Sequence, residues 1–159
     1  MASSETPAPS AADRAGVVLF AYDGSELATL AIEQAARQLA PGRAALIVCV
    51  WQPGDVGFVA PGEHHLNAAQ ATEVRSAAQD TAAHGASLAL EAGFRSRSMA
   101  IEAAPTWKGI VEVAEQHQAG VIVLGSHRRS GLAGHLLGSV TAAVIAHSPT
   151  PVFVVHGPV

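Results

Sequence analysis

Residues 120–139, GVIVLGSHRRSGLAGHLLGS, hold the two features that decide the fold of this chain. The opening GVIVL is a short apolar run rich in β-branched residues, which predicts a buried strand. Glycines, serines and the adjacent Arg128 and Arg129 then interrupt the apolar pattern before a helix-like segment begins near Ser139. A strand, a small-residue loop and a helix start together present backbone N–H groups to an anion. The stretch therefore predicts an α/β fold with an anion site, best suited to the phosphates of a nucleotide.

The remainder of the chain alternates between apolar strand-like runs and helix-like segments. Further strands are predicted at 17–22, 44–51, 95–101 and 149–155, and helices at about 26–39, 65–91, from 106 onward and 139–147. The run at 95–101 partly alternates, which is typical of a half-exposed edge strand. Continuously apolar strands separated by helices indicate a parallel sheet covered on both faces. We therefore predict a doubly wound α/β domain with a five-stranded parallel sheet.

The boundaries of that domain and some details of its helices can also be predicted. We expect the domain to comprise residues 16–157 and residues 1–15 to form a disordered tail. Either Asp23 or Ser25 is expected to cap the first helix, and Thr106 the third. Gly85, inside the second helix, predicts a bend or close packing. The inward face of the first helix is expected to contain Leu27, Leu30, Ala31, Ala35 and Leu39.

Composition excludes several functional classes. Apolar residues make up 49% of the 159 residues, but their runs are too short to span a bilayer. The formal net charge of −4 argues against nonspecific binding to nucleic acid or to acidic membranes. Cys49 is the only cysteine, so no internal disulfide forms, and residues 1–15 lack the pattern of a secretory signal. A cytoplasmic protein with a small anionic ligand is expected.

Residues at the expected strand ends outline a binding crevice. Open α/β sheets bind ligands at the carboxyl ends of their strands, where the strand order reverses. Asp23, Trp51 and Gly125 each follow a strand end, so we expect them to converge there. Gly138–Ser139 adds open backbone, a hydroxyl group and the first N–H groups of a helix. Alone, Gly125 is more typical of a turn and Ser139 of an ordinary helix cap, but together they favour ligand binding.

The loop and its flanks resemble the universal stress protein family. Nucleotide-binding members carry Gly, two residues, Gly, nine residues, and then Gly-Ser or Gly-Thr. Here Gly125 is followed by two residues, Arg128, nine residues and Gly138–Ser139. The Asp23-Gly24-Ser25 turn and the element order over residues 16–155 are also similar to this family.

The resemblance implies an adenine nucleotide alpha-hydrolase-like fold that binds ATP, with or without Mg²⁺. Asp23 would lie by the ribose, and the backbone of Val50 would contact adenine. Gly125 would lie under the ribose and the first phosphates. The remaining residues implied for the site are Ala21 and Tyr22 at the adenine pocket, and Gly138, Ser139 and Val140 at the outer phosphates.

Arg128 departs from the family pattern because it occupies the second glycine position. If that position needs a positive φ or a close approach to the ligand, arginine strains the loop by ~1–3 kcal/mol and blocks the phosphates. Alternatively, Arg128 or Arg129 lies over the phosphates as a charge-assisted donor. The sequence leaves both alternatives open.

The apolar segment Pro151–Val155 predicts a homodimer. An unpaired apolar strand at a sheet edge needs cover, and the same strand of a second copy supplies it across a twofold axis. The resemblance implies such a dimer too.

Other chemistry has less support in the sequence. Serines and histidines such as Ser139, Ser130, His127 and His135 suggest a hydrolase, yet no G-x-S-x-G elbow is present. Glu63-His64-His65 lacks the spacing of a metal site, and neither a Walker A motif nor G-x-G-x-x-G occurs. We expect an ATP-binding regulator of stress response with at most slow ATPase activity. The alternatives are a nucleotide-free dimeric scaffold in which Arg128 closes the phosphate site and, less favoured, a small α/β hydrolase or nucleotide-modifying enzyme.

Overall fold

Five parallel strands alternate with four helices in the computed structural model, which describes residues 15–52, 68–126 and 137–157. The sheet order is β3-β2-β1-β4-β5, so the chain winds outward from β1 in one direction and then in the other. The predicted doubly wound five-stranded fold is confirmed. The elements are β1 (Val17–Ala21), α2 (Glu26–Gln38), β2 (Ala44–Trp51), α3 (Ala68–Glu91), β3 (Arg95–Glu102), α4 (Thr106–Gln116), β4 (Ala119–Gly125), α5 (Ser139–His147) and β5 (Val152–Val155).

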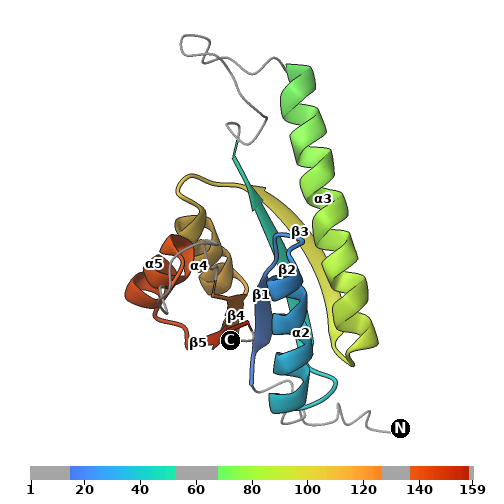
Figure 1. Cartoon of the computed structure of the whole chain (residues 1–159), viewed down its shortest axis with the longest axis vertical. Coiled ribbons are helices and arrows are strands. Elements are labelled where there is room, and N and C mark those ends of the chain that lie inside the picture. The colour runs from blue at the N-terminus through green and yellow to red at the C-terminus, as the bar shows by residue number, and fades with distance from the viewer. Residues whose placement is uncertain (1–14, 53–67, 127–136, 158–159) are drawn as a thin grey trace, which may run out of the picture.

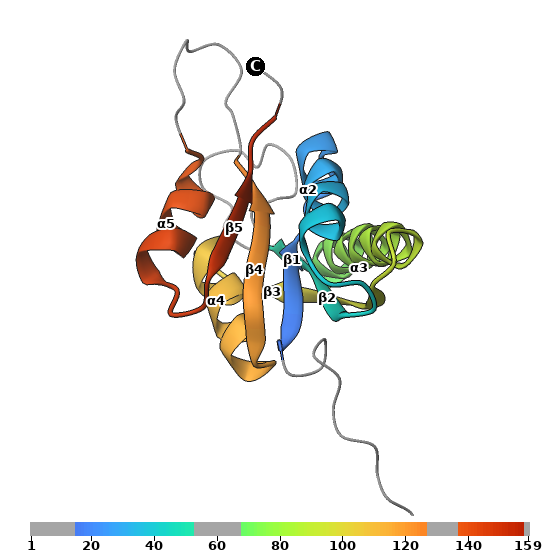
Figure 2. The same cartoon turned by 90° about the horizontal axis from the view of Figure 1, so that it is seen from below.

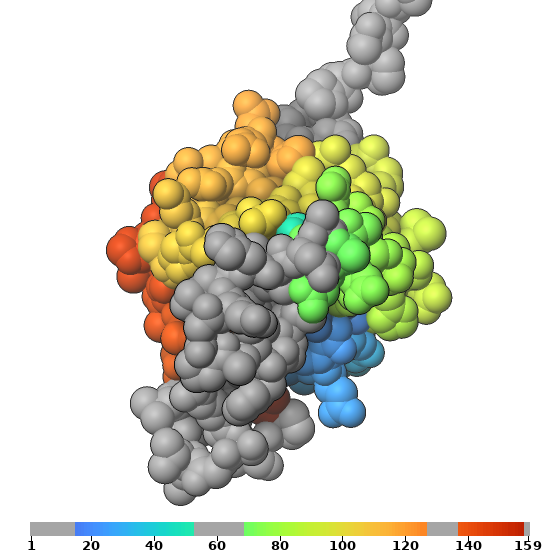
Figure 3. All heavy atoms as spheres, turned by 90° about the horizontal axis from the view of Figure 1, so that it is seen from above, coloured from blue at the N-terminus to red at the C-terminus, as the bar shows by residue number. Residues whose placement is uncertain are grey.

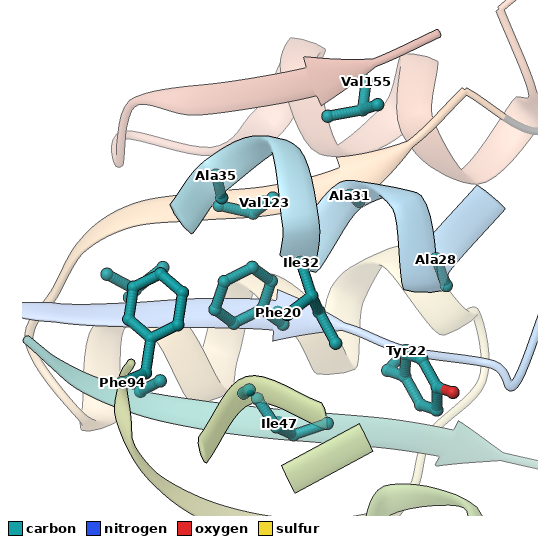
Figure 4. Close-up of a cluster of buried hydrophobic side chains, with 13 residues drawn as sticks. Phe20, Tyr22, Ala28, Ala31, Ile32, Ala35, Ile47, Phe94, Val123 and Val155 are labelled. Carbon is teal, nitrogen blue, oxygen red and sulfur yellow. The ribbon is translucent and has the colours of Figure 1, made fainter. Parts of the chain in front are cut away.

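The sheet separates two helical layers, each with its own core. Helices α2 and α3 cover one face, and α4 and α5 cover the other (Figure 1, Figure 2). On the α2 and α3 side, Phe20 and Phe94 meet edge to face with ring centroids 5.3 Å apart, beside Ile32 and Ile47 (Figure 4). The α4 and α5 side is filled by aliphatic side chains of β1, β2 and β4. Since both faces are covered, β1, β2 and β4 are continuous apolar runs in the sequence, whereas the edge strand β3 is partly exposed and alternates.

Helix α2 begins at a Ser25 cap, and its inward face confirms the expectation for Ala31 and Ala35 but not for the leucines. The Ala28 N–H donates to Ser25 Oγ at 3.1 Å, so serine and not aspartate caps the helix. The leucines predicted to face inward are only half-buried, because small alanines bring the helix axis close to the sheet and leave longer side chains at the margins. The buried residues are Ala28, Ala31, Ile32 and Ala35.

Helix α3 passes through Gly85 without a break, and the glycine permits close packing. A Cβ at this position would lie 2.7 Å from Tyr22 Cδ1 and 2.9 Å from Ile47 Cγ2. Of the two predicted explanations for this glycine, the structure bears out close packing. The helix ends at Glu91, and Gly93 just beyond it has a φ of +98°, the left-handed conformation that terminates many helices.

The two ends of the sheet order are edges, as predicted for β3 and β5. Between β1 and β2, the buried Arg43 donates from Nη2 to the carbonyls of Ala15 and Gly16, at 2.7 and 2.9 Å, where β1 begins. Burial lowers the pKa of this guanidinium. Cys49 is buried in the sheet and forms no disulfide. Among the described helices, none has both the length and the apolar character that crossing a membrane requires.

Candidate functional site

A cavity of about 260 Å³ opens at the carboxyl ends of β1, β2 and β4. It lies where the strand order reverses, since β1 is followed in the chain by β2 on one side and is paired with β4 on the other. Figure 3 views this end of the molecule and shows the end of β2 between α3 and the start of α4. The lining of the cavity includes six of the predicted site residues, namely Ala21, Tyr22, Asp23, Val50, Gly125 and Val140.

One wall of the cavity is apolar and is built by β2 and α4. Val48 and Val50 belong to the α4 side of the sheet, where Ile110 packs from the helix. Trp51 points to the other side, where it packs on Cys49 and Ala82 and is only 8% exposed. The expectation that Trp51 joins this crevice is therefore wrong, because successive side chains of a strand alternate between its faces.

The backbone of Val50 is exposed to the cavity because β1 ends before it. The β1–β2 register ends at Ala21 and Val48, and the Tyr22 N–H donates to the Val48 carbonyl at 2.9 Å. Alternate residues of a parallel strand direct their N–H and C=O groups to the same neighbour. Val50, two residues beyond Val48, therefore directs both groups into the space that β1 has left.

Tyr22 lies in the cavity lining, but its ring is packed in the hydrophobic core. The ring is 3% exposed and lies in the core on the α2 side, beside Ile47 (Figure 4). Its hydroxyl is 3.3 Å from Thr29 Oγ1. The aromatic ring is thus committed to holding the turn after β1 against α2.

Asp23 is the carboxylate at the rim of the cavity. Its Oδ1 accepts the Ser25 N–H at 3.0 Å, which fixes the turn between β1 and α2 and leaves the second oxygen outside that bond. The side chain is exposed, and Gly24 in the same turn has a φ of +81°. The turn therefore holds a charged oxygen at the cavity entrance.

Gly125 is the last residue of β4, and it packs closely against Leu27 of α2. A Cβ there would lie 2.6 Å from Leu27 Cγ and 3.3 Å from the Leu27 carbonyl oxygen. The Gly125 carbonyl accepts the Thr141 hydroxyl hydrogen bond at 3.0 Å, and Thr141 is only 2% exposed. Glycine is thus required by helix packing, and the threonine ties the first turn of α5 to the end of β4.

The start of α5 faces the same region. Gly138 is the N-cap and supplies no side-chain oxygen to the first-turn N–H groups, and Ser139 is exposed. Among the described residues, the cavity lining includes Val140 and Thr141 but neither Gly138 nor Ser139. Arg128 lies outside the described residues, as do the histidines near it.

Sequence reasoning missed two cavity hydroxyls, those of Thr106 and Thr141. Thr106 was expected to cap α4, but Pro105 is the N-cap and Thr106 is the first helical residue. No local pattern marks either threonine, because each lines the cavity through the packing of its helix on strand ends. Within the described segments, no three His, Cys, Asp or Glu side chains come together as metal ligands.

Known proteins resemble this chain over nearly its whole length. The model of the universal stress protein family matches residues 15–156. The universal stress protein MJ0577 of Methanocaldococcus jannaschii is 38% identical over 65 residues, a segment that spans 41% of this chain and 40% of that protein. The solved structure of MJ0577 has a TM-score of 0.72 at 22% identity, with 90% of this chain and 96% of that chain covered.

Two further solved structures hold nucleotides. A universal stress protein in complex with cAMP is 27% identical, with a TM-score of 0.54 over 89% of this chain and 96% of that one. The universal stress protein from Archaeoglobus fulgidus in complex with dAMP is 21% identical, with a TM-score of 0.53 over 87% of this chain and 94% of that one. The second likeness is one of fold alone.

Proposed function

Because this chain belongs to the universal stress protein family, we propose that its cavity binds ATP and that the protein is a nucleotide-dependent regulator. The observation that carries the proposal is one cavity lined by Val50, Asp23 and the first turn of α5. These three features suit the base, the sugar and the phosphates of a nucleotide respectively. The complex of a 27% identical relative with cAMP supports an adenine nucleotide as the ligand class.

The adenine would lie against the apolar wall beside Val50. Adenine presents an amine donor next to a ring-nitrogen acceptor, and the C=O and N–H of Val50 complement this pair. The flat ring would bury its faces among Val48, Ile110 and Ala21, which line the same cavity. Burial of an aromatic base in an apolar slot with few polar contacts is the usual architecture of a cofactor site.

The ribose and phosphates would lie toward Asp23 and α5. The second carboxylate oxygen of Asp23, which does not take part in the Ser25 bond, can accept hydrogen bonds from ribose hydroxyls. The N–H groups of the first turn of α5 carry the positive end of the helix dipole, and Gly138, Ser139 and Val140 are the residues from which they project. With Gly125 at the end of β4, these residues form the proposed site for ATP, which would bind with or without Mg²⁺ on its phosphates.

The remaining parts of the proposal concern turnover and assembly. The chain has no Walker A motif, so we expect any ATP hydrolysis to be slow. The domain over residues 16–157 would act in the cytoplasm as a homodimer joined along Pro151–Val155. A nucleotide-free dimeric scaffold is the second candidate, because Arg128 stands where the family pattern has glycine.

Calorimetric titration with ATP tests the proposal. We expect the wild-type protein to bind ATP and Asp23→Asn to bind it about tenfold more weakly, because the amide keeps the Ser25 contact but removes the charge-assisted acceptor. Ser139→Ala is expected to weaken binding less, since its backbone N–H remains. Glu33→Gln, on the exposed face of α2, removes an equal charge away from the cavity and is the matched control.

Each result decides between the two candidates. Wild-type binding that falls in Asp23→Asn but not in Glu33→Gln supports the ATP site. Absence of binding in the wild type, with binding gained in Arg128→Gly, would establish the scaffold in its place.

A further inference from the structure

Thr106 is held at the adenine end of the cavity by a hydrogen bond from Gln52. Gln52 follows β2 directly, and its Nε2 donates to Thr106 Oγ1 at 2.9 Å. Thr106 is half-buried and lines the cavity together with Val50, two residues before Gln52. The contact therefore joins the end of β2 to the first turn of α4 at the place where the base is proposed to lie.

The first turn of α4 is fixed against the sheet, so the Thr106 hydroxyl has a defined position. Gly109 permits this approach, because a Cβ there would lie 2.5 Å from Ala103 Cβ and 3.0 Å from Ile101 Cδ1. Pro105 caps the helix without a side-chain hydrogen bond, and Thr106 takes no part in capping. The hydroxyl is thus not used to start the helix.

The direction of the Gln52 contact sets what Thr106 can offer to a ligand. An amide N–H only donates, so the Thr106 oxygen is the acceptor in this bond, and its own O–H remains a donor. The Thr106 side chain makes no second hydrogen bond to a described residue. The other side chains at this end, those of Val48, Val50 and Ile110, are apolar. A donor in such surroundings needs a ligand acceptor when water is displaced.

We propose that Thr106 donates a hydrogen bond to a ring nitrogen of the bound adenine, with Gln52 as the positioning residue that orients the hydroxyl. The inference rests on the proposed ATP site and adds to it a side chain that reads the base. Adenine has more than one ring-nitrogen acceptor, so the one facing Thr106 is separate from the one that Val50 contacts. Selectivity for adenine then depends on the direction of the Gln52–Thr106 hydrogen bond, in which Gln52 donates and Thr106 accepts.

Binding of ATP and of ribose 5-triphosphate to three variants tests this inference. Thr106→Val removes the hydroxyl at equal volume, and Thr106→Ser keeps it. Gln52→Glu reverses the contact, because the introduced carboxylate can only accept and turns the Thr106 O–H away from the base. We expect the ratio of ATP affinity to ribose 5-triphosphate affinity to fall about five- to tenfold in Thr106→Val and Gln52→Glu. In Thr106→Ser the ratio should change by less than about twofold.

Ribose 5-triphosphate lacks the base, so the ratio is insensitive to a general loss of folding or to added charge near the phosphates. The 1-, 3- and 7-deaza forms of ATP supply a second measurement. One of them should bind the wild-type protein as weakly as Thr106→Val binds ATP, and its affinity should not depend on Thr106→Val. An unchanged ratio in Thr106→Val, or equal sensitivity of all three deaza forms to this substitution, would overturn the inference and leave the ATP site intact. Failure of the wild-type protein to bind ATP would overturn the proposed function and this inference with it.

Discussion

Of two buried hydroxyl groups near the end of β4, one forms a hydrogen bond and the other has no partner among the described residues. The Ser126 side chain is 2% exposed, and its Oγ has no hydrogen-bond partner among the described residues. Thr141 is equally buried, but its hydroxyl donates to the Gly125 carbonyl at 3.0 Å. A buried polar atom without a partner lowers stability by its desolvation, whereas a satisfied one does not. These neighbours should therefore respond differently to removal of their hydroxyl groups.

We expect Ser126→Ala to leave the free energy of unfolding unchanged or to raise it by up to about 1 kcal/mol. Thr141→Val is the matched variant, and it should lower the same quantity by about 1–2 kcal/mol because the Gly125 carbonyl loses its donor. Urea denaturation of both variants measures the difference. A greater loss in Ser126→Ala than in Thr141→Val would show that the serine has a partner.

The elements show which sequence patterns determine structure locally. The bounds of β2 and α5 were predicted to the residue, because a β-branched run ends at polar residues and a Gly-Ser pair marks the start of a helix. The inward face of α2 was predicted less well. Leucine hydrophobicity favoured Leu27 and Leu30, yet close approach of the helix to the sheet favours alanine. Such a distance between elements is a tertiary property that periodicity does not encode.

Helix α3 offers a direct test of close packing against helix propensity. Replacing Gly85 by alanine raises the propensity of an isolated helix by about 1 kcal/mol. In the protein, the added Cβ would meet Tyr22 and Ile47 at less than 3.0 Å. Tyr22 is buried and cannot move freely, so the helix must shift. We expect Gly85→Ala to lower the free energy of unfolding by about 1–2 kcal/mol in denaturant titrations.

Ser87→Ala provides the control for Gly85→Ala on the same helix. Ser87 is exposed, and its Oγ donates to the Ala83 carbonyl within the helix at 3.2 Å. Its replacement should change stability by less than about 0.5 kcal/mol. If Gly85→Ala proved more stable than the wild type, the propensity gain would exceed the packing cost, and the contact with Tyr22 would be looser than described.

At the scale of the whole molecule, the sheet order determines both the cavity and the exposed edge. Strand order reverses beside β1, which brings Asp23, Val50 and Gly125 together although they are far apart in the sequence. The convergence of Asp23 and Gly125 was predictable because parallel strands align their carboxyl ends, but Trp51, predicted with them, points to the other face of β2. The participation of Thr106 was not predictable, since it depends on which face of β2 is covered by α4. The same order leaves β5 at one end of the sheet, so its outer backbone groups have no neighbouring strand in the described chain.

The outer edge of β5 permits a substitution that separates assembly from folding. Pro151 and Val155 direct their carbonyls to β4, where they accept the N–H groups of Ile122 and Ser126 at 2.9 and 2.8 Å. Val154 therefore directs its own N–H and C=O away from β4, toward the open edge. Proline at this position removes the outward N–H and is tolerated in edge strands, so Val154→Pro should keep the domain folded while abolishing pairing with a second copy.

We expect the wild-type protein to be a dimer at micromolar concentration and Val154→Pro to be a monomer, as measured by sedimentation equilibrium. Val154→Thr keeps the N–H and the β-branched shape and should remain dimeric. Circular dichroism should show the same helix and strand content in all three proteins, because the β4–β5 ladder does not use the Val154 N–H. A wild-type monomer would rule out the dimer, and a dimeric Val154→Pro would move the interface away from this edge. ATP titration of the same three proteins would show whether the nucleotide site depends on the dimer.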